Sequence, residues 1–148
     1  MDVTARLDTP YPPATVFEWV EDLTTYPRWL DIVSRAEPEA EAHAWSVDLR
    51  GRLGPFARTK RLRMVRARHE PPQHVTFERD ERDGRRHSPW VLRAEVEAAG
   101  DGCRLTMHLH YGGALWGPVL ERLLGDEIER SRPRLLALIE GGDRPAPS

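Results

Sequence analysis

Arg79, His87 and Tyr111 are the side chains that come nearest to a general acid–base set in this sequence. A tyrosine hydroxyl can relay a proton, and an arginine can stabilise developing negative charge. The chain contains no phosphate loop, no G-x-S-x-G, no dinucleotide fingerprint and no H-E-x-x-H motif. Arg79 and Tyr111 are therefore the candidate catalytic residues, and no cofactor is expected.

Arg79 continues the alternation of Val75 and Phe77, which predicts that its side chain points into the interior. A buried arginine needs a partner. That partner would be either a nearby carboxylate, such as Glu81 or Asp83, or an anionic group of a ligand. Alternatively, the strand twists out to solvent before residue 79.

His108 and His110 share one face of an alternating strand, a spacing at which two histidines can chelate a metal. Their face is opposite to that of Leu105 and Met107, which indicates solvent, and the sequence offers no third ligand. We therefore predict no metal site. Cys103 opens the same strand and is interpreted as a small packed residue rather than a nucleophile.

Aromatic and apolar side chains in the inward phase of the expected strands are the candidate ligand-binding residues. Tyrosine and tryptophan combine an apolar body with one polar group, which suits an aromatic ligand, although the same side chains could be ordinary core. Trp116 precedes the last helix, where it could border an open end or contact a partner. The predicted ligand-binding residues are Trp45, Leu62, Phe77, Arg79, Trp90, Leu92, Met107, Tyr111 and Trp116.

The segment 50–68 holds eight basic residues and no acidic one. A phosphate or nucleic-acid patch would have this composition. However, the net charge is −2 and Lys60 is the only lysine among 22 basic residues, which indicates an arginine bias typical of a GC-rich bacterial genome. We therefore interpret the segment as the solvent-exposed face of a hairpin and predict no nucleic-acid binding.

The strand phase within residues 58–69 has two interpretations. Leu62 and Met64 favour one inward phase, whereas Val65 favours the other, which would turn Arg61 and Arg63 toward the interior. A β-bulge would reconcile the two patterns.

The elements that position these residues follow from hydrophobic periodicity. A first strand around 3–7 precedes two short helices, over 14–22 and from 22–24 to about 33. Alternating strands fill residues 45–111, with Asp83-Gly84 as a hairpin signal. A long helix with an apolar stripe runs from Gly117 to Gly141, and Pro133 is expected to kink it.

An antiparallel sheet with one apolar face and a long amphipathic helix can bury their apolar surfaces against each other. The sequence therefore predicts an α+β fold. About six to seven strands curve around the long C-terminal helix, two short helices follow strand 1, and a cavity can remain between helix and sheet. Residues 1–141 are predicted to form one domain, and residues 142–148 a disordered tail.

Two stretches resemble the helix-grip superfamily of START, Bet v 1-like and polyketide cyclase/dehydrase (SRPBCC) proteins. They are PATVFEWVEDLTTYPRWLDIV near the start and LHYGGALWGPVLERLLGDEIE near the end, and the likeness covers nearly all of residues 1–141. The resemblance implies a cavity for an apolar or aromatic molecule such as a lipid, sterol, quinone or polyketide. It also implies that the short helices form a V at the pocket mouth, with Tyr26 and Trp29 filling an elbow that Pro27 bends.

Three hypotheses follow. The first is a cytoplasmic module that binds or transports a small hydrophobic or aromatic molecule without a cofactor. The second, implied by the resemblance, is a polyketide cyclase/dehydrase-type enzyme, which needs Arg79 and Tyr111 in one cavity. The third is a protein-interaction module with a filled core. The sequence contains no run of 18 apolar residues, so we predict no membrane insertion. It leaves the identity of the ligand and the oligomeric state open.

Overall fold

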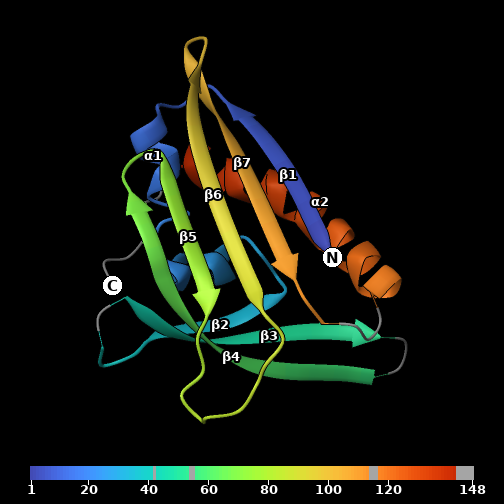
Figure 1. The fold of residues 1–148 in the computed structure, drawn as a ribbon. Coiled ribbons are helices and arrows are strands. Elements are labelled where there is room, and N and C mark those ends of the chain that lie inside the picture. Colours follow the sequence, from blue (N-terminus) through green and yellow to red (C-terminus); the bar gives the residue numbers. More distant parts are fainter. Residues whose placement is uncertain (42, 54–55, 114–116, 143–148) are drawn as a thin grey trace.

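Alternating apolar residues form one curved antiparallel sheet, and a long helix lies across its concave side (Figure 1). The computed structural model describes residues 1–41, 43–53, 56–113 and 117–142. Within these residues the strands are β1 (Asp2–Thr9), β2 (Val33–Pro38), β3 (Ala44–Leu53), β4 (Phe56–Glu70), β5 (His74–Arg79), β6 (Trp90–Ala99) and β7 (Gly102–Tyr111). The helices are α1 (Pro13–Phe17), the 3-10 helix η1 (Leu23–Arg28) and α2 (Gly117–Glu140).

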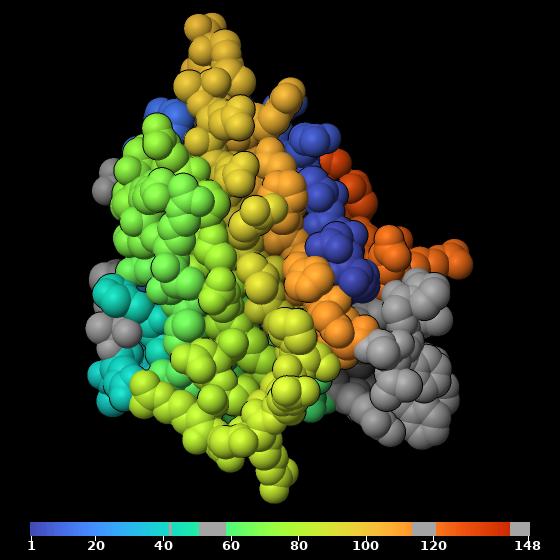
Figure 2. All heavy atoms as spheres, viewed as in Figure 1, coloured from blue at the N-terminus to red at the C-terminus, as the bar shows by residue number. Residues whose placement is uncertain are grey.

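The strand order is β1-β7-β6-β5-β4-β3-β2, so each strand from β2 to β6 pairs with its successor and β1 closes the far edge beside β7. The helix α2 packs principally along β1. Figure 2 shows the convex face of the sheet, behind which most of α2 is hidden. The predicted fold, a curved antiparallel sheet of about six to seven strands with a long C-terminal helix, is confirmed.

The segment after β1 differs from the two α-helices that the sequence predicts over 14–33. The first helix ends at Phe17, and the second is a single 3-10 segment that contains Pro27. Asp22 caps that segment by accepting a hydrogen bond from the Thr24 N–H at 2.9 Å. The chain then enters β2 at Val33, a strand that the sequence analysis did not predict.

The elbow is closed by aromatic side chains, as the resemblance implied. Tyr26 is fully buried and its hydroxyl donates to the Val20 carbonyl at 2.9 Å. Trp29 packs against Tyr26 with ring centroids 4.6 Å apart and donates from Nε1 to the Trp19 carbonyl at 3.3 Å. Burial raises the pKa of the Tyr26 hydroxyl far above its usual range, so this group stays neutral and acts as a packing residue with one hydrogen bond.

The phase of β4 is settled by a register shift between Arg66 and Arg68, which is a β-bulge or similar irregularity. Leu62 and Met64 pair with inward residues of β3 and are buried in the core. The alternative phase, in which Arg61 and Arg63 would face the cavity, is wrong. The register shift lies beyond Val65, which pairs with Glu78 in the outward phase, so it changes the phase only for the last residues of the strand.

The helix α2 ends where the sequence predicts, since Gly142 has a positive φ of 71° just after it. Pro133 lies inside the helix without ending it. Leu124, Leu135 and Ile139 are buried against the sheet and elbow. In the described part of the chain, no helix has both the length and the apolar character to cross a bilayer. The predicted tail falls largely on residues 143–148, outside the described residues.

Candidate functional site

One row of side chains crosses the concave face of the sheet from β3 to β7. Trp45 pairs with Met64, Met64 pairs with Arg79, and Trp90 pairs with Tyr111. Glu78 of β5 pairs with Val91 of β6. In this antiparallel register the adjacent residues Arg79 and Trp90 are therefore neighbours across the two strands. The predicted site residues Trp45, Arg79, Trp90 and Tyr111 therefore share one face and one level of the sheet.

Several apolar side chains on this concave face are not fully covered. The partly exposed ones, on β1, β6 and β7, are Val3, Leu92, Met107, Leu109 and Tyr111. They alternate with polar residues of the convex face, and inward neighbours such as Phe77 and Ala94 are fully buried. The concave face is thus a core at its centre and an accessible apolar surface toward β1 and β7.

The aromatic members of the row pack in two groups. Trp90 and Tyr111 lie with ring centroids 4.5 Å apart. Trp45 meets Phe77 edge to face at 5.5 Å. Tyr111 also lies so close to Gly113 that a Cβ at this glycine would come within 1.9 Å of the tyrosine hydroxyl. The position of the Tyr111 ring therefore depends on a residue without a side chain just after β7.

The side chain of Arg79 is only 7% exposed, and its hydrogen bonds go to protein groups. Its Nε donates to Glu81 Oε1 at 3.0 Å, and its two terminal nitrogens contact the Ser88 carbonyl at 3.3 Å and His87 Nδ1 at 3.2 Å. The carboxylate that the sequence analysis required is Glu81. A ligand anion is not needed to balance the Arg79 charge.

His87 links Arg79 to a second carboxylate, because its Nε2 lies 2.8 and 2.9 Å from the two oxygens of Asp83. Arginine can only donate, so Nδ1 accepts and the proton resides on Nε2. The backbone N–H of Arg85 and the imidazole of His87 lower the pKa of Asp83. The Asp83-Gly84 turn thus belongs to a longer connection, residues 80–89, which this network ties to the end of the sheet.

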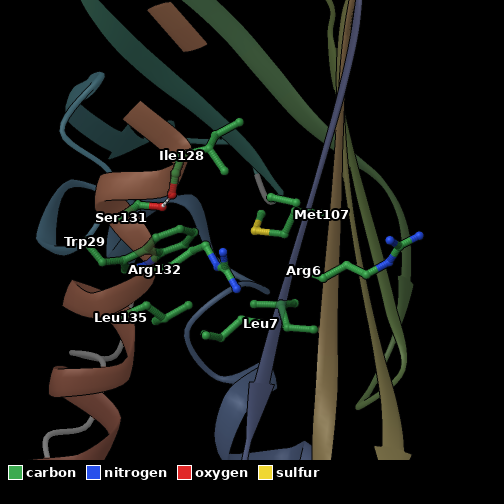
Figure 3. A pocket seen from close by; sticks show the side chains of 10 residues that line it. Arg6, Leu7, Trp29, Met107, Ile128, Ser131, Arg132 and Leu135 are labelled. Carbon is green, nitrogen blue, oxygen red and sulfur yellow. Dashed lines mark hydrogen bonds between the residues drawn. The ribbon is translucent and has the colours of Figure 1, made fainter. Parts of the chain in front are cut away.

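A small void lies between the sheet and α2, with a volume of about 30 Å³. Figure 3 shows Leu7 and Met107 on the sheet side facing Ile128, Ser131 and Leu135 on α2. The void holds no more than about one water molecule. The full lining comprises Ala5, Arg6, Leu7, Trp29, Leu105, Met107, Ile128, Ser131, Arg132 and Leu135.

Four arginines of the basic segment are bonded to other parts of the chain. Arg63 is 9% exposed. It forms ion pairs with Glu39 and Glu41, which precede it in the sequence, and with Asp80, which follows it. The others bond acceptors as well: Arg61 bonds Asp48, Arg66 bonds the Glu21 carbonyl, and Arg68 bonds Glu70. Three of the eight basic residues, Arg61, Arg63 and Arg68, are therefore paired with carboxylates within the fold.

His108 and His110 lie on the convex face, where they contact Thr4 at 3.1 Å and Asp2 at 2.9 Å. Among the described residues, no group of three or more histidine, cysteine, aspartate or glutamate side chains could hold a metal ion. Cys103 is buried within the core, with its sulfur 3.4 Å from the Thr9 hydroxyl. None of these three residues joins the row of the concave face.

Sequence reasoning missed part of this surface. Val3 and Leu109 have the same alternation as the residues that were selected, so their pattern carried the signal. Ile128 and Ser131 on α2 carried none, because a helix stripe does not reveal which residues border a void. Trp116 lies outside the described residues. The remaining predicted ligand-binding residues stay predictions, although all of them lie in the inward phase.

A family model described as "Polyketide cyclase / dehydrase and lipid transport" matches residues 1–140. The chain belongs to this family. No curated protein sequence matches the chain significantly.

Solved structures show the same fold at low identity. A START superfamily protein from Mycobacterium smegmatis is 15% identical, with a TM-score of 0.72 over 95% of this chain and 97% of that one. A protein from Thermus thermophilus is 15% identical, with a TM-score of 0.71 over 96% and 99% of the two chains. A protein from Mesorhizobium loti is 12% identical, with a TM-score of 0.70 over 97% and 99%. At these identities the likeness extends to the polyketide cyclase/dehydrase fold and no further.

Proposed function

We propose that this chain binds a small hydrophobic or aromatic molecule between the concave face of its sheet and α2. The observation that carries this proposal is the set of partly exposed apolar side chains on that face, Leu92, Met107 and Leu109 foremost. Apolar surface left open on the inner side of a fold gains free energy when an apolar molecule covers it, about 25 cal/mol per Å². The description of the family, which includes lipid transport, supports the same reading.

A ligand that enters the described void between the sheet and α2 requires that void to widen. Ligand pockets usually have volumes of roughly 300–1,000 Å³, and the void between α2 and the sheet measures about 30 Å³. Arg134 on α2 forms an ion pair with Asp31, which ties the C-terminal half of the helix to the elbow. In the proposed bound state α2 moves away from β1 and β7 against the restraint of this ion pair, and the ligand takes the space that is released.

N-phenyl-1-naphthylamine, a neutral fluorescent apolar probe, tests the proposal. Leu92→Glu and Val91→Glu form a matched pair, because the two residues are adjacent on β6, both are partly exposed and they face opposite sides of the sheet. Titration should show saturable fluorescence enhancement in the unmodified protein and in Val91→Glu, and a loss of at least tenfold in affinity in Leu92→Glu. Equal binding by both variants would place the probe elsewhere and overturn the proposal.

Native mass spectrometry of freshly purified protein gives an independent readout. A small-molecule mass that disappears under denaturing conditions supports a natural ligand and gives its mass. If the protein neither carries such a mass nor binds the naphthylamine probe, the interaction-module hypothesis gains, because that hypothesis needs no internal ligand.

The cyclase/dehydrase alternative is favoured by one observation and opposed by another. Arg79 and Tyr111 lie on one face, on either side of Trp90, as that hypothesis requires. However, the Arg79 guanidinium already bonds Glu81, the Ser88 carbonyl and His87. A role in stabilising an oxyanion would use its remaining N–H groups or require some of these partners to leave.

A further inference from the structure

Within the part of the chain that the structure describes, two indole nitrogens on the concave face have no hydrogen-bond partner. They are Nε1 of Trp45 and Nε1 of Trp90, in residues that are 4% and 6% exposed. Both atoms are shielded from bulk solvent. Nearly all buried polar groups in native proteins are paired. Two unpaired donors on the face that is proposed to bind a ligand therefore point to the chemistry of that ligand.

The ring neighbours of these indoles do not accept hydrogen bonds from them, although the Tyr111 hydroxyl is chemically able to accept. Trp45 has the ring of Phe77 at 5.5 Å and the guanidinium of Arg66 at 5.6 Å, and an arginine only donates. Trp90 has the ring of Tyr111 at 4.5 Å. Both indoles are held in place by these ring contacts. Because neither indole N–H is bonded to these neighbours, an acceptor on a bound ligand can pair with it.

The two donors differ from the indole of Trp29, which also borders the concave space but donates its N–H to the Trp19 carbonyl at 3.3 Å. The indole N–H of Trp29, which closes the elbow, thus has a hydrogen-bond partner within the fold. Trp45 and Trp90 belong to the same cross-strand row and are three strand spacings apart, about 14 Å along a flat sheet. The curvature of the sheet brings the two closer together on its concave side.

We infer that Trp45 and Trp90 determine specificity for a ligand that carries carbonyl or similar acceptor oxygens on an apolar, aromatic body. This inference rests on the proposed function and adds a chemical requirement to it. A pure hydrocarbon would fill the space and leave both donors unpaired. A ketone or quinone of the same shape pairs at least one of them.

Fluorene and 9-fluorenone form a matched pair of probes, because they share a planar tricyclic shape and differ by a methylene against a carbonyl. The inference predicts that fluorenone binds about tenfold more tightly, which is the usual effect of one hydrogen bond. Trp45→Phe or Trp90→Phe should reduce this ratio toward one. Val91→Glu, which changes a side chain on the convex face, is the control and should leave the ratio unchanged.

Indole ¹H–¹⁵N NMR signals of the unmodified protein give a readout that does not depend on how the variants fold. The chain has five tryptophans, so five such signals are expected. Fluorenone should move the signal of Trp45 or Trp90 downfield, and fluorene should not. If both probes bind equally and neither signal moves, the inference is overturned while the proposed function stands. If neither probe binds, both are overturned.

Discussion

Arg79 donates a hydrogen bond from Nε to Glu81 Oε1 across 3.0 Å, and the two side chains are only 7% and 19% exposed. The Glu81 carboxylate also accepts a hydrogen bond from the backbone N–H of Arg63 at 3.0 Å. This largely buried pair fixes the end of β5 to β4 just beside the concave row. The main role of this pair is therefore to stabilise the end of the sheet rather than to bind a substrate.

Glu81→Leu should destabilise the protein by roughly 3 kcal/mol, because it leaves the Arg79 charge buried without its carboxylate. Arg79→Met together with Glu81→Leu should recover part of that loss, since removing both charges of a buried pair costs less than removing one. Urea unfolding of the two proteins provides the comparison. A double variant no more stable than Glu81→Leu would contradict the view that the pair is balanced internally.

Gly113→Ala should destabilise the chain and displace the Tyr111 ring, because a Cβ at this position meets the tyrosine hydroxyl at 1.9 Å. The control is Gly125→Ala in α2, where a Cβ meets nothing within 4 Å. That change should stabilise the protein by about 0.5–1 kcal/mol through helix propensity. Thermal unfolding should therefore move in opposite directions for the two substitutions. Adding Tyr111→Ala to Gly113→Ala should relieve the clash.

Stability should fall as the pH drops from about 7 toward 5, in part because of His74. Burial lowers the pKa of this histidine below its ordinary value, and the nearby Arg68 acts in the same direction against Glu95 and Glu70. The unfolded chain therefore binds the proton first. The contribution is fully present above the unfolded pKa and is lost as the pH falls through it toward the lower folded pKa.

His74→Gln tests this pH dependence. Its free energy of unfolding, measured by urea titration at several pH values, should change less between pH 7 and 5 than that of the unmodified protein. His110→Gln is a suitable control, since His110 is a half-exposed residue that bonds Asp2 on the convex face. An equal slope in the His74 variant and the unmodified protein would contradict the assignment.

Asp31→Asn should speed association of the apolar probe, because it weakens the ion pair with Arg134 that ties α2 to the elbow. The substitution should change stability little, by less than about 1 kcal/mol, since both side chains are half exposed. Stopped-flow fluorescence with N-phenyl-1-naphthylamine measures the rate. An unchanged association rate would indicate that α2 does not have to move for entry. Arg104→Gln, which breaks an exposed pair with Asp8 at the opposite face, is the control.

Much of the fold could be predicted from the sequence because periodicity reports which face of an element is buried. The alternation from Trp90 to Val96 and the stripe of α2 identified the sheet face and the helix face correctly. β2 was missed because Val33 to Pro38 has mostly exposed side chains and little alternation. The inward phase of β4 could not be chosen from the sequence, because the position of a register shift depends on how the strand pairs with its neighbour.

The candidate site was predicted less completely, for a physical reason. Inward phase could be read for Phe77, Trp90 and Tyr111, but hydrogen-bond partners come from distant segments. The partner of Arg79, and the lack of one for the Trp45 indole among the described residues, depend on packing between separate strands and loops. Such relationships leave no local pattern.

The most direct test of ligand binding in the concave space uses protein labelled with ¹³C at the methionine methyl groups. The chain has three methionines, and Met64 and Met107 both lie on the concave face. Saturation with N-phenyl-1-naphthylamine should shift the Met107 signal strongly, because its side chain is partly exposed there. A bound probe that leaves the Met64 and Met107 signals unchanged would contradict the central claim.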